Sequence, residues 1–408
     1  MFYLGLDFGT SGARACVINA ASSVAFEASV KYVVPQQQDT ADWRAALFDL
    51  LAQIPRAHRA ALAAIAIDGT SGTVLLADDA LEPLAPALLY NDTRRASAGM
   101  DDVPLPGSLA KGMWLMQQPG TVHARYFLHQ ADWLAALLTG VGGMSDYHNA
   151  LKTGFDPCTL DWPAWIQALP IAQLLPRVVP PGTPLARINR HTARHFNVNP
   201  ACIVRAGTTD SIAAFIATGV AQPGDAVTSL GTTLVLKLLS TTRVESSEYG
   251  VYSHRFGNLW LAGGASNSGG GVLRQFFSDA TLVELSMKIH PDQPSGLDYY
   301  PLPRPGERFP VHAPALQPRL EPRPVDDVRF LHGMLEGIAR IEALGYARLA
   351  ELGATPLRRV ISAGGGSKNE AWRRIREKQL GVPVETAQQG EAAFGAARLA
   401  QAGVKSFP

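Results

Sequence analysis

The order of apolar and polar stretches predicts an α/β chain that opens with strands. Four apolar segments are strand candidates, namely residues 2–6, 13–18, 24–33 and 63–67. Between the last two segments, apolar residues from Trp43 to Ile54 recur at helical spacing behind Asp39, and Pro55 ends the helix. The last segment is apolar throughout, which is typical of a central strand buried on both faces. The pattern therefore predicts a mixed sheet flanked by helices.

The rest of the chain also alternates between helical and strand patterns. Residues 125–140 predict a helix that stops at Gly140, and the Pro-rich residues 170–184 predict a surface connection. A strand at 203–207 leads into a helix, and the Asp210 carboxylate is expected at the start of that helix. Further predicted strands are 226–229, 234–239, 359–362 and 383–386, and further predicted helices are 324–353, 370–381 and 391–402.

Two polar turns in distant parts of the chain share one pattern. Phe8-Gly9-Thr10-Ser11 aligns with Leu230-Gly231-Thr232-Thr233, and each turn lies between apolar strands. This short repeat suggests two related halves, each of which offers a backbone-rich hairpin to one shared ligand.

Composition and charge narrow the class of protein. The chain has 408 residues, of which 47% are hydrophobic and 17% are charged, as expected of a globular protein with two or three domains. The formal net charge of +1 gives no indication of binding to nucleic acid or to an anionic membrane. No apolar run approaches the ~20 residues of a membrane-spanning helix, and no basic leader precedes the first strand. Three scattered cysteines indicate a reducing compartment, so we expect a cytoplasmic protein without nucleic-acid or membrane partners.

The turn formed by Gly9, Thr10, Ser11 and Gly12 has the composition of an anion-binding loop. Small residues let main-chain N–H groups approach a phosphate, and the two hydroxyls add donors. A carboxylate beside such a loop, here Asp7, normally works through Mg²⁺, because the cation bridges two anions. The plain alternative is a β-hairpin with a solvated aspartate. A P-loop is excluded because the chain has no G-x-x-x-x-G-K-[ST] motif, and a strand instead of a helix follows Gly12, which argues against a Rossmann loop.

Asp210 has two possible roles at the start of its helix. It can be an N-cap residue, whose side chain accepts hydrogen bonds from the first turn. It can also be a general base, because a carboxylate accepts the hydroxyl proton when a phosphoryl group is transferred to an alcohol.

A third glycine-rich loop, Gly364-Gly365-Gly366-Ser367-Lys368-Asn369, lies between a predicted strand and a predicted helix. Its glycines let a ring-shaped ligand such as adenine press close to the backbone, and a flexible connection is the alternative.

Two further polar clusters fit a polyhydroxy ligand. They are Asp68-Gly69-Thr70-Ser71-Gly72-Thr73 and Asn91-Asp92-Thr93-Arg94. Each sugar hydroxyl needs both a donor and an acceptor, which amides, hydroxyls and carboxylates supply together. Either cluster alone is typical of a solvated loop, but their joint occurrence favours a sugar.

In this order the motifs resemble those of the FGGY carbohydrate kinases, members of the actin, Hsp70 and sugar kinase superfamily. Residues 7–11, 207–211, 229–233 and 364–369 resemble the family's first phosphate, catalytic-aspartate, second phosphate and adenosine motifs, respectively. Weaker similarities lie at residues 132–140, 145–150, 263–267 and 306–308. The resemblance spans nearly the whole chain. It implies two ribonuclease H-like (actin-like ATPase) domains with an active site in the interdomain cleft.

The resemblance implies a role for each motif residue. Asp210 would be the general base, and Asp7 would organise the substrate and, through water, Mg²⁺. The residues implied to hold ATP are Thr10, Ser11, Gly231, Thr232 and Thr233 at the phosphates, and Gly365, Gly366, Asn369 and Trp372 around adenosine. The residues implied to bind the sugar are Asp7, Ser71, Gly72, Asp92 and Asp210.

The implied function is an ATP-dependent kinase of a ketopentose. Xylulose kinases usually carry Met-His-Gly where this chain has Thr70-Ser71-Gly72, and the whole loop resembles that of short D-ribulose kinases. We therefore expect D-ribulose as the first acceptor, giving D-ribulose 5-phosphate, and D-xylulose or another small sugar or polyol as the second. A non-catalytic sugar or nucleotide sensor on the same fold stays open.

The expected domain organisation follows the motifs. Residues 1–221 would form the sugar-side domain, residues 222–390 the nucleotide-side domain, and residues 391–408 a helix that packs back on the first domain. A monomer or a homodimer is expected. The chain departs from the family pattern at Gly112, where a large apolar residue is usual, and at Glu377-Lys378, where Ala-Asp is common.

Overall fold

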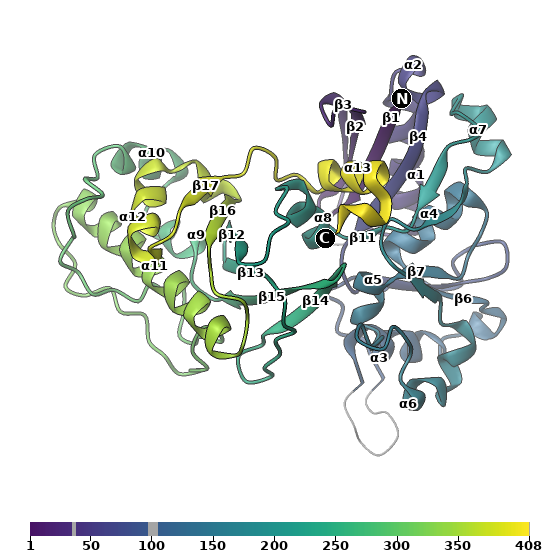
Figure 1. Ribbon diagram of the computed structural model, residues 1–408. Helices are drawn as coiled ribbons and strands as arrows, with labels where there is room; N and C mark the ends of the chain where they lie inside the picture. Colours follow the sequence, from purple (N-terminus) through teal and green to yellow (C-terminus); the bar gives the residue numbers. More distant parts are fainter. Residues whose placement is uncertain (35–37, 97–104, 408) are drawn as a thin grey trace. The chain divides into compact units, whose positions relative to one another are not determined.

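The computed structural model describes residues 1–34, 38–96 and 105–407 (Figure 1). The chain divides into two compact units. Unit 1 comprises residues 1–219 and 391–407, and unit 2 comprises residues 220–390. Pro408, with which the expected last segment ends, lies outside the described residues.

Unit 1 is built on a seven-stranded mixed sheet with the strand order β3-β2-β1-β4-β10-β9, in which β11 also pairs with β4. Its strands are β1 (Phe2–Phe8), β2 (Gly12–Asn19), β3 (Val24–Lys31), β4 (Leu62–Gly69), β9 (Pro184–Arg187), β10 (Ile203–Arg205) and β11 (Thr208–Thr209). The register of the parallel pair β1–β4 places Asp7 beside Asp68, and the parallel pair β11–β4 places Thr208 beside Asp68 from the other side. The carboxyl ends of three strands therefore meet at one edge of the sheet.

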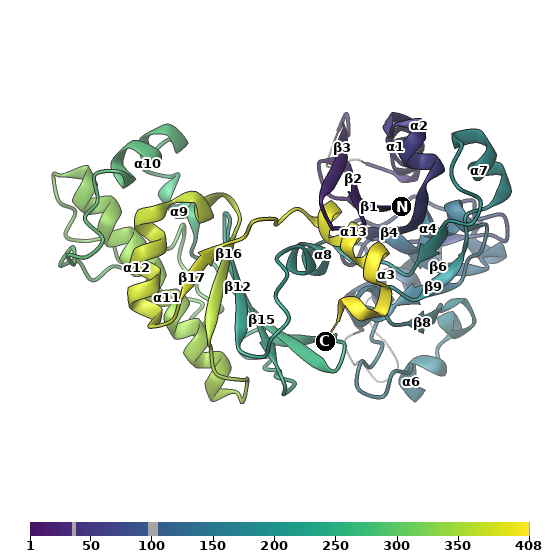
Figure 2. The same ribbon diagram turned by 45° about the horizontal axis from the view of Figure 1, so that its top comes forward.

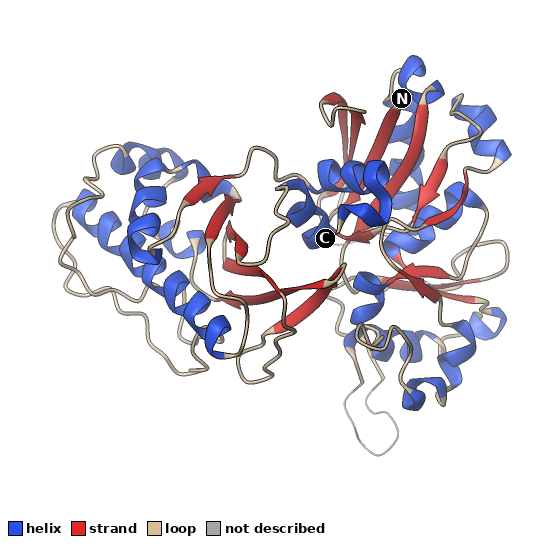
Figure 3. Ribbon diagram, in the orientation of Figure 1, coloured by secondary structure: helices blue, strands red, loops and turns tan. Residues whose placement is uncertain are grey.

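Helices flank this sheet, and two small two-stranded sheets extend unit 1 (Figure 3). The helices are α1 (Thr40–Gln53), α2 (Arg56–Ala60), α3 (Gly107–Leu115), α4 (Gln130–Thr139), α5 (Tyr147–Leu151), α6 (Ala164–Gln167), α7 (Arg190–Phe196), α8 (Asp210–Ala217) and α13 (Ala392–Ala402). The small sheets pair β5 (Val74–Ala77) with β6 (Tyr126–His129) and β7 (Met144–Asp146) with β8 (Arg177–Val179). Although α13 comes last in the sequence, it packs against β1 and α8 (Figure 1).

Two predictions for unit 1 were wrong. The predicted helix at 125–140 begins as strand β6, because these residues pair with β5 in the register Val74↔His129, and the helix starts only at Gln130. Its predicted end at Gly140 is confirmed by a left-handed C-cap. The Pro-rich residues 170–184 are not only a surface connection. They contain a 3-10 helix (Pro170–Leu174) with a fully buried Ile171, and β8, which pairs with β7.

Unit 2 is built on a six-stranded sheet with the strand order β14-β15-β13-β12-β16-β17. Its strands are β12 (Asp225–Leu230), β13 (Leu234–Ser240), β14 (Tyr252–Phe256), β15 (Leu259–Ser266), β16 (Arg359–Ala363) and β17 (Val384–Thr386). Its helices are α9 (Gly270–Leu273), α10 (Asp279–Ser286), α11 (Asp327–Glu351) and α12 (Glu370–Leu380). Helix α11 packs against β13, β15 and α12, and Figure 2 shows α11 and α12 beside each other from a second direction.

The pairings around the two polar turns are the same in both units. In unit 1, β1 is antiparallel to β2 and parallel to β4. In unit 2, β12 is antiparallel to β13 and parallel to β16. The mixed α/β sheets that the sequence predicted are therefore confirmed, and the two turns occupy corresponding places in them. In the described part of the chain, no helix is both long and apolar enough to cross a membrane.

Candidate active site

The turn after β1 presents main-chain amides to solvent. The carbonyl groups of Thr10 and Ser11 are already occupied, because they accept hydrogen bonds from Gln38 Nε2 at 2.8 Å and from the Tyr32 amide at 3.2 Å. Within the described ranges, the amides of Thr10 and Ser11 donate to no other group. Both residues are exposed. The turn therefore offers two oriented N–H donors and two hydroxyls to an anion.

Asp7 ends β1 directly before this turn and is 3% exposed. Arg14 on β2 donates from Nη1 to Asp7 Oδ2 at 3.2 Å. Burial raises the pKa of Asp7 above its ordinary value, while Asp68 and Arg14 act in the opposite direction. The Arg14 contact favours the ionised form of Asp7, so Asp7 is the carboxylate of this pair.

Asp68 is the neighbour of Asp7 on β4 and is fully buried. Its pKa lies well above the ordinary value, first because burial removes water and then because Asp7 and Asp210 are negatively charged. Apart from its interaction with Asp7, neither of its side-chain oxygens has a hydrogen-bond partner in the described part of the chain. Two carboxylates this close in a dry site cannot both ionise, so Asp68 carries the proton.

Asp210 lies at the start of α8, where the sequence placed it, but it is not the N-cap residue. Thr209 occupies the N-cap, and Asp210 Oδ1 accepts a hydrogen bond from the next amide, that of Ser211, at 2.6 Å. The strand that leads to Asp210 is fixed from the side, because His148 Nδ1 and Thr208 Oγ1 are 2.7 Å apart. The half-buried Asp210 carboxylate therefore stands on a rigid support near Asp68.

The loop after β4, residues 68–73, is held by a network of hydroxyl and amide groups. Gln130 Oε1 accepts from the Thr70 amide and from Thr70 Oγ1, both at 2.9 Å. Thr70 Oγ1 and Thr73 Oγ1 are 2.6 Å apart, and Thr73 Oγ1 accepts from the Tyr90 amide at 3.0 Å. The network joins the 68–73 loop to the segment that carries Asp92.

Lys111 connects the same two segments through its ammonium group. Its Nζ donates to the carbonyl oxygens of Gly72 at 3.0 Å and Tyr90 at 3.1 Å, and also to that of Leu89. Burial lowers the pKa of Lys111 to about 8, although Asp92 opposes the shift. Ser71 and Gly72 thus lie in the same part of unit 1 as the Asp92 segment.

Asp92 itself is engaged by a neighbour. Arg94 donates from Nη2 to Asp92 Oδ2 at 2.6 Å and from Nε to Oδ1 at 3.1 Å, and these bonds hold the pKa of Asp92 below its ordinary value. The carboxylate is therefore ionised, and any ligand that contacts it would compete with Arg94.

Buried polar atoms without partners gather around the 68–73 loop. Ser108 Oγ, Gln130 Nε2 and Thr209 Oγ1 are buried and make no hydrogen bond in the described ranges, where the buried Asp68 carboxyl has only Asp7 as a hydrogen-bond partner. Thr209 pairs with Gly69, and Ser108 Oγ lies 3.5 Å from the point where a Cβ of Gly72 would lie. Unsatisfied buried groups are costly, so this concentration marks a place where a polar ligand or ordered water completes the hydrogen bonding.

In unit 2, the turn Gly231-Thr232-Thr233 packs on a second glycine-rich segment. The carbonyls of Gly231 and Thr232 accept from the amides of Gly270 at 2.8 Å and Gly271 at 2.9 Å. The amides of residues 231–233 donate to no other group among the described residues. As in unit 1, the carbonyls are occupied and the N–H donors point to a potential anion.

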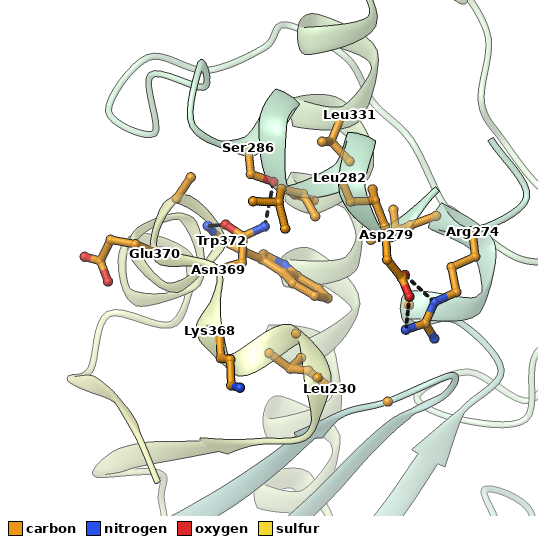
Figure 4. Close-up of a pocket in the computed structure, with 18 of the residues that line it drawn as sticks. Leu230, Arg274, Asp279, Leu282, Ser286, Leu331, Lys368, Asn369, Glu370 and Trp372 are labelled. Carbon is orange, nitrogen blue, oxygen red and sulfur yellow. Dashed lines mark hydrogen bonds and ion pairs between the residues drawn. The ribbon is translucent and has the colours of Figure 1, made fainter. Parts of the chain in front are cut away.

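A cavity of about 810 Å³ adjoins this turn and is lined by unit 2 alone (Figure 4). Figure 4 shows the Trp372 indole among the lining side chains, with Leu230 and Leu282 nearby. Most of the other lining residues belong to α10, α11 and the 364–369 loop. The lining includes Gly231, Thr232, Val283, Ser286, Met287, Leu331, Leu335, Gly365, Gly366 and Asn369. The walls are thus largely apolar, as expected for a site that takes a flat ring.

The loop 364–369 cannot carry a side chain at Gly366. A Cβ there would lie 2.7 Å from the Trp372 ring and 2.9 Å from Leu230 Cβ. Asn369 caps α12 by accepting from the Trp372 amide at 3.0 Å, and its Nδ2 donates to Ser286 Oγ at 2.8 Å. Asn369 therefore joins the loop to α10, across the cavity from α11.

A buried ion pair holds the elements behind this loop. Arg376 on α12 donates to both oxygens of Glu342 on α11, at 2.6 and 2.7 Å, and to Ser362 Oγ on β16 at 2.6 Å. Thr228 Oγ1 on β12 also donates to Glu342, at 2.6 Å. Four elements thereby meet at one buried network, which fixes both ends of the 364–369 loop.

Comparisons with known proteins show which proteins this chain is similar to. Residues 226–404 match the model of the FGGY family of carbohydrate kinases, C-terminal domain. The xylulose kinase of Klebsiella pneumoniae is 26% identical over 446 aligned residues, which cover 98% of this chain and 90% of that protein. The crystal structure of a xyloylose kinase from Brucella ovis is 25% identical, with a TM-score of 0.83 over 100% of this chain and 91% of that one.

Residues 226–404 are thus similar to the C-terminal domain of the FGGY carbohydrate kinases, and nearly the whole chain is similar to xylulose kinases. The predicted resemblance, the two-domain actin-like ATPase fold and the assignment as a sugar phosphotransferase are confirmed. The gluconokinase of Bacillus subtilis is also similar, at 20% identity over 94% of this chain and 84% of that protein. Relatives named for different sugars share this fold, so the family alone does not specify the acceptor.

Several residues around the candidate site were given no role of their own from the sequence, although Asp68 belongs to the predicted polar cluster 68–73. They are Asp68, Ser108, Lys111, Gln130, Thr209 and Lys152, whose Nζ donates to the Ser71 carbonyl, in unit 1, and Leu282, Val283, Ser286 and Met287 in unit 2. The sequence could have indicated Asp68, because this residue ends a buried strand in the same way as Asp7. The others reach the site only through tertiary packing. In the described part of this kinase, no group of three or more His, Cys, Asp or Glu side chains comes together at metal-binding distance.

We predict that Asp68→Asn changes how the stability of this kinase depends on pH. The pKa of Asp68 is raised in the folded state, so its contribution to stability is complete below the ordinary carboxyl pKa and is lost as the pH rises through the folded pKa. The Asn variant cannot lose a proton. As the pH rises through this window, the free energy of unfolding of the Asn variant should therefore increase relative to that of the wild type. The increase should be up to about 1.4 kcal/mol for each pH unit.

Urea denaturation at several pH values between 4 and 8 measures the effect. Asp49→Asn, on the exposed side of α1, is the matched control and should run parallel to the wild type. Parallel curves for Asp68→Asn as well would contradict a protonated Asp68.

Proposed function

We propose that this protein phosphorylates a ketopentose with ATP, with D-xylulose as the first candidate acceptor and D-ribulose as the second. Xylulose kinases that align with nearly all of this chain support D-xylulose, which reverses the order that the 68–73 loop suggested. The observation that carries the sugar site is the group of buried, unpartnered polar atoms around that loop. A polyhydroxy ligand supplies the donors and acceptors that these atoms lack.

In this proposal, the two units bind different substrates. Unit 1 holds the sugar between the 68–73 loop, Asp92, Asp7 and Asp210. Unit 2 holds the nucleotide, with adenosine in the 810 Å³ cavity beside Trp372, Gly366 and Asn369, and with phosphates at Gly231, Thr232 and Thr233. Thr10 and Ser11 offer the second set of phosphate donors.

Asp210 is the proposed general base. A carboxylate that accepts the proton of the sugar hydroxyl lets the oxygen attack the γ-phosphorus as the P–O bond to ADP breaks. The rigid N-terminal position on α8 fixes the carboxylate, and the neutral Asp68 does not compete for the same proton. The carboxylate of Asp7 fits a hard cation, because Mg²⁺ prefers oxygen ligands and keeps several waters. A Mg²⁺ ion held by Asp7 through water would neutralise charge on the ATP phosphates.

The acceptor is tested with purified protein, ATP and a panel of sugars. A coupled ADP-release assay with D-xylulose, D-ribulose, L-ribulose, D-gluconate and glycerol should give the highest kcat/KM with one of the two D-ketopentoses. ADP release at an equal rate without sugar, or a clear preference for gluconate or glycerol, would refute a ketopentose kinase.

Asp210→Asn should reduce kcat for the best sugar by about 10² to 10⁴, the usual contribution of a general base, and should leave the affinity for ATP unchanged. Asp49→Asn, on the exposed face of α1, should behave like the wild type in the same assay. Turnover of Asp210→Asn within threefold of the wild type would remove Asp210 from the base role.

Gly366→Ala should raise the KM for ATP by about tenfold, because the new methyl group displaces the Trp372 ring from the cavity wall. The KM for the sugar should not change, since the substitution lies in unit 2. Gly390→Ala is the matched control, because its methyl group would meet only Ala363 Cβ, at 4.0 Å. An unaltered KM for ATP in Gly366→Ala would argue against adenosine in this cavity.

A further inference from the structure

Two lysines approach the 68–73 loop, and their ammonium groups are used in different ways. Lys111 Nζ donates to three carbonyl oxygens, those of Gly72, Leu89 and Tyr90. An ammonium group has three donors, so Lys111 has none left for a ligand. Its contribution to the site is to brace the loop.

Lys152 follows α5 and is exposed. Its Nζ donates to the Ser71 carbonyl at 3.3 Å, and the other two donors of the ammonium group make no hydrogen bond in the described part of the chain. Its Cδ lies 3.4 Å from the point where a Cβ of Gly72 would lie. Because Gly72 has no side chain, the Lys152 side chain lies directly over the loop.

The surroundings of Lys152 are those of the acceptor site. Although the residue as a whole is exposed, protein atoms around the ammonium group displace part of its water and lower the pKa of Lys152, while attraction by Asp210 partly offsets this shift. The Lys152 carbonyl accepts from the Ser108 amide at 3.0 Å, which places the unpartnered Ser108 hydroxyl close by. The segment is anchored through His148, whose ring bonds Thr208 on the strand before Asp210.

Lys152 supplies hydrogen-bond donors, which the carboxylates around the 68–73 loop lack. Ionised carboxylates such as Asp7 and Asp210 only accept hydrogen bonds, whereas sugar oxygens also need donors. The available ammonium donors of Lys152 meet that need at the 68–73 loop, and hydrogen bonds from a charged group are stronger than neutral ones.

We propose that Lys152 is a sugar-binding residue, whose ammonium group donates hydrogen bonds to oxygen atoms of the acceptor while Asp210 takes the proton of the reacting hydroxyl. This inference rests on the proposed sugar kinase function. The contact is made in the ground state and in the transition state alike, so its loss should raise the KM for the sugar more than it lowers kcat.

The test compares Lys152→Met, Lys152→Arg and the control Lys405→Met, an exposed lysine of unit 1 outside the site. Calorimetric titration with D-xylulose and with D-ribulose should show affinity for the better sugar reduced by about ten- to a hundredfold in Lys152→Met. Lys152→Arg should retain most of the affinity, and Lys405→Met should match the wild type. The affinity of every variant for ATP should be unchanged, and urea denaturation curves that match the wild type show that unit 1 of each variant is folded.

A deoxy-sugar series adds a measurement that a purely structural role would not affect. If Lys152 donates to one hydroxyl, removal of that hydroxyl from the sugar should weaken binding to the wild type but not binding to Lys152→Met any further. Equal sugar affinity of Lys152→Met and the wild type overturns the inference and leaves the kinase proposal intact. Loss of ATP affinity with unchanged sugar affinity also overturns it, in favour of a phosphate contact. A wild type that neither binds nor phosphorylates any ketopentose refutes the proposed function itself.

Discussion

The parallel pairing of β1, β4 and β11 is the constraint on which the chemistry of unit 1 depends. The register puts Asp7, Asp68 and Thr208 in one row, and Asp210 follows two residues after Thr208. Carboxyl groups so close together in a site with little water cannot all be ionised. The cost is lowest when the fully buried Asp68 keeps its proton, because Asp7 has Arg14 as a partner. The sheet thus determines the position of the carboxyl groups and also their charge.

In the proposed function, unit 2 meets a different requirement, which is to hold a flat ligand against a loop that has almost no side chains. Glycine residues give the 364–369 loop its close approach to Trp372, but glycine also makes a loop more flexible. The Glu342–Arg376 pair compensates for this flexibility, since it joins α11, α12, β16 and β12 directly behind the loop. A buried pair is weak support for stability in general, yet here every charged oxygen has a donor, so the network can keep the loop in place.

The sequence predicted the features that depend on neighbouring residues. Strands β1, β2, β4, β12 and β13, the two polar turns and the start of α1 near Asp39 all follow from local apolar patterns and turn residues. Residues 126–129 were placed in a helix because their pattern continues into α4, and only the pairing with β5 makes them a strand. Lys152 and Gln130 could not be assigned for a similar reason. Gln130 lies 60 residues from Thr70, and Lys152 lies 81 residues from Ser71, and the sequence has no pattern that connects them to these contacts.

The near-neutral net charge of the chain agrees with phosphate binding by main-chain amides, which needs no excess of Lys or Arg side chains. Phosphates at residues 10–11 and 231–233 would be met by main-chain amides, whose direction is set by carbonyls that already have partners. Such donors depend on backbone shape and tolerate changes in the side chains around them. The proposed sugar site is different, because side chains from distant segments would supply its donors and acceptors. A replacement at Gly72 or Lys152 alters the volume and the charge over one loop while the turns at residues 10–11 and 231–233 stay as they are. Relatives can therefore keep one fold for phosphoryl transfer and still differ in the sugar that they accept, as the names of the xylulose kinases and the gluconokinase indicate.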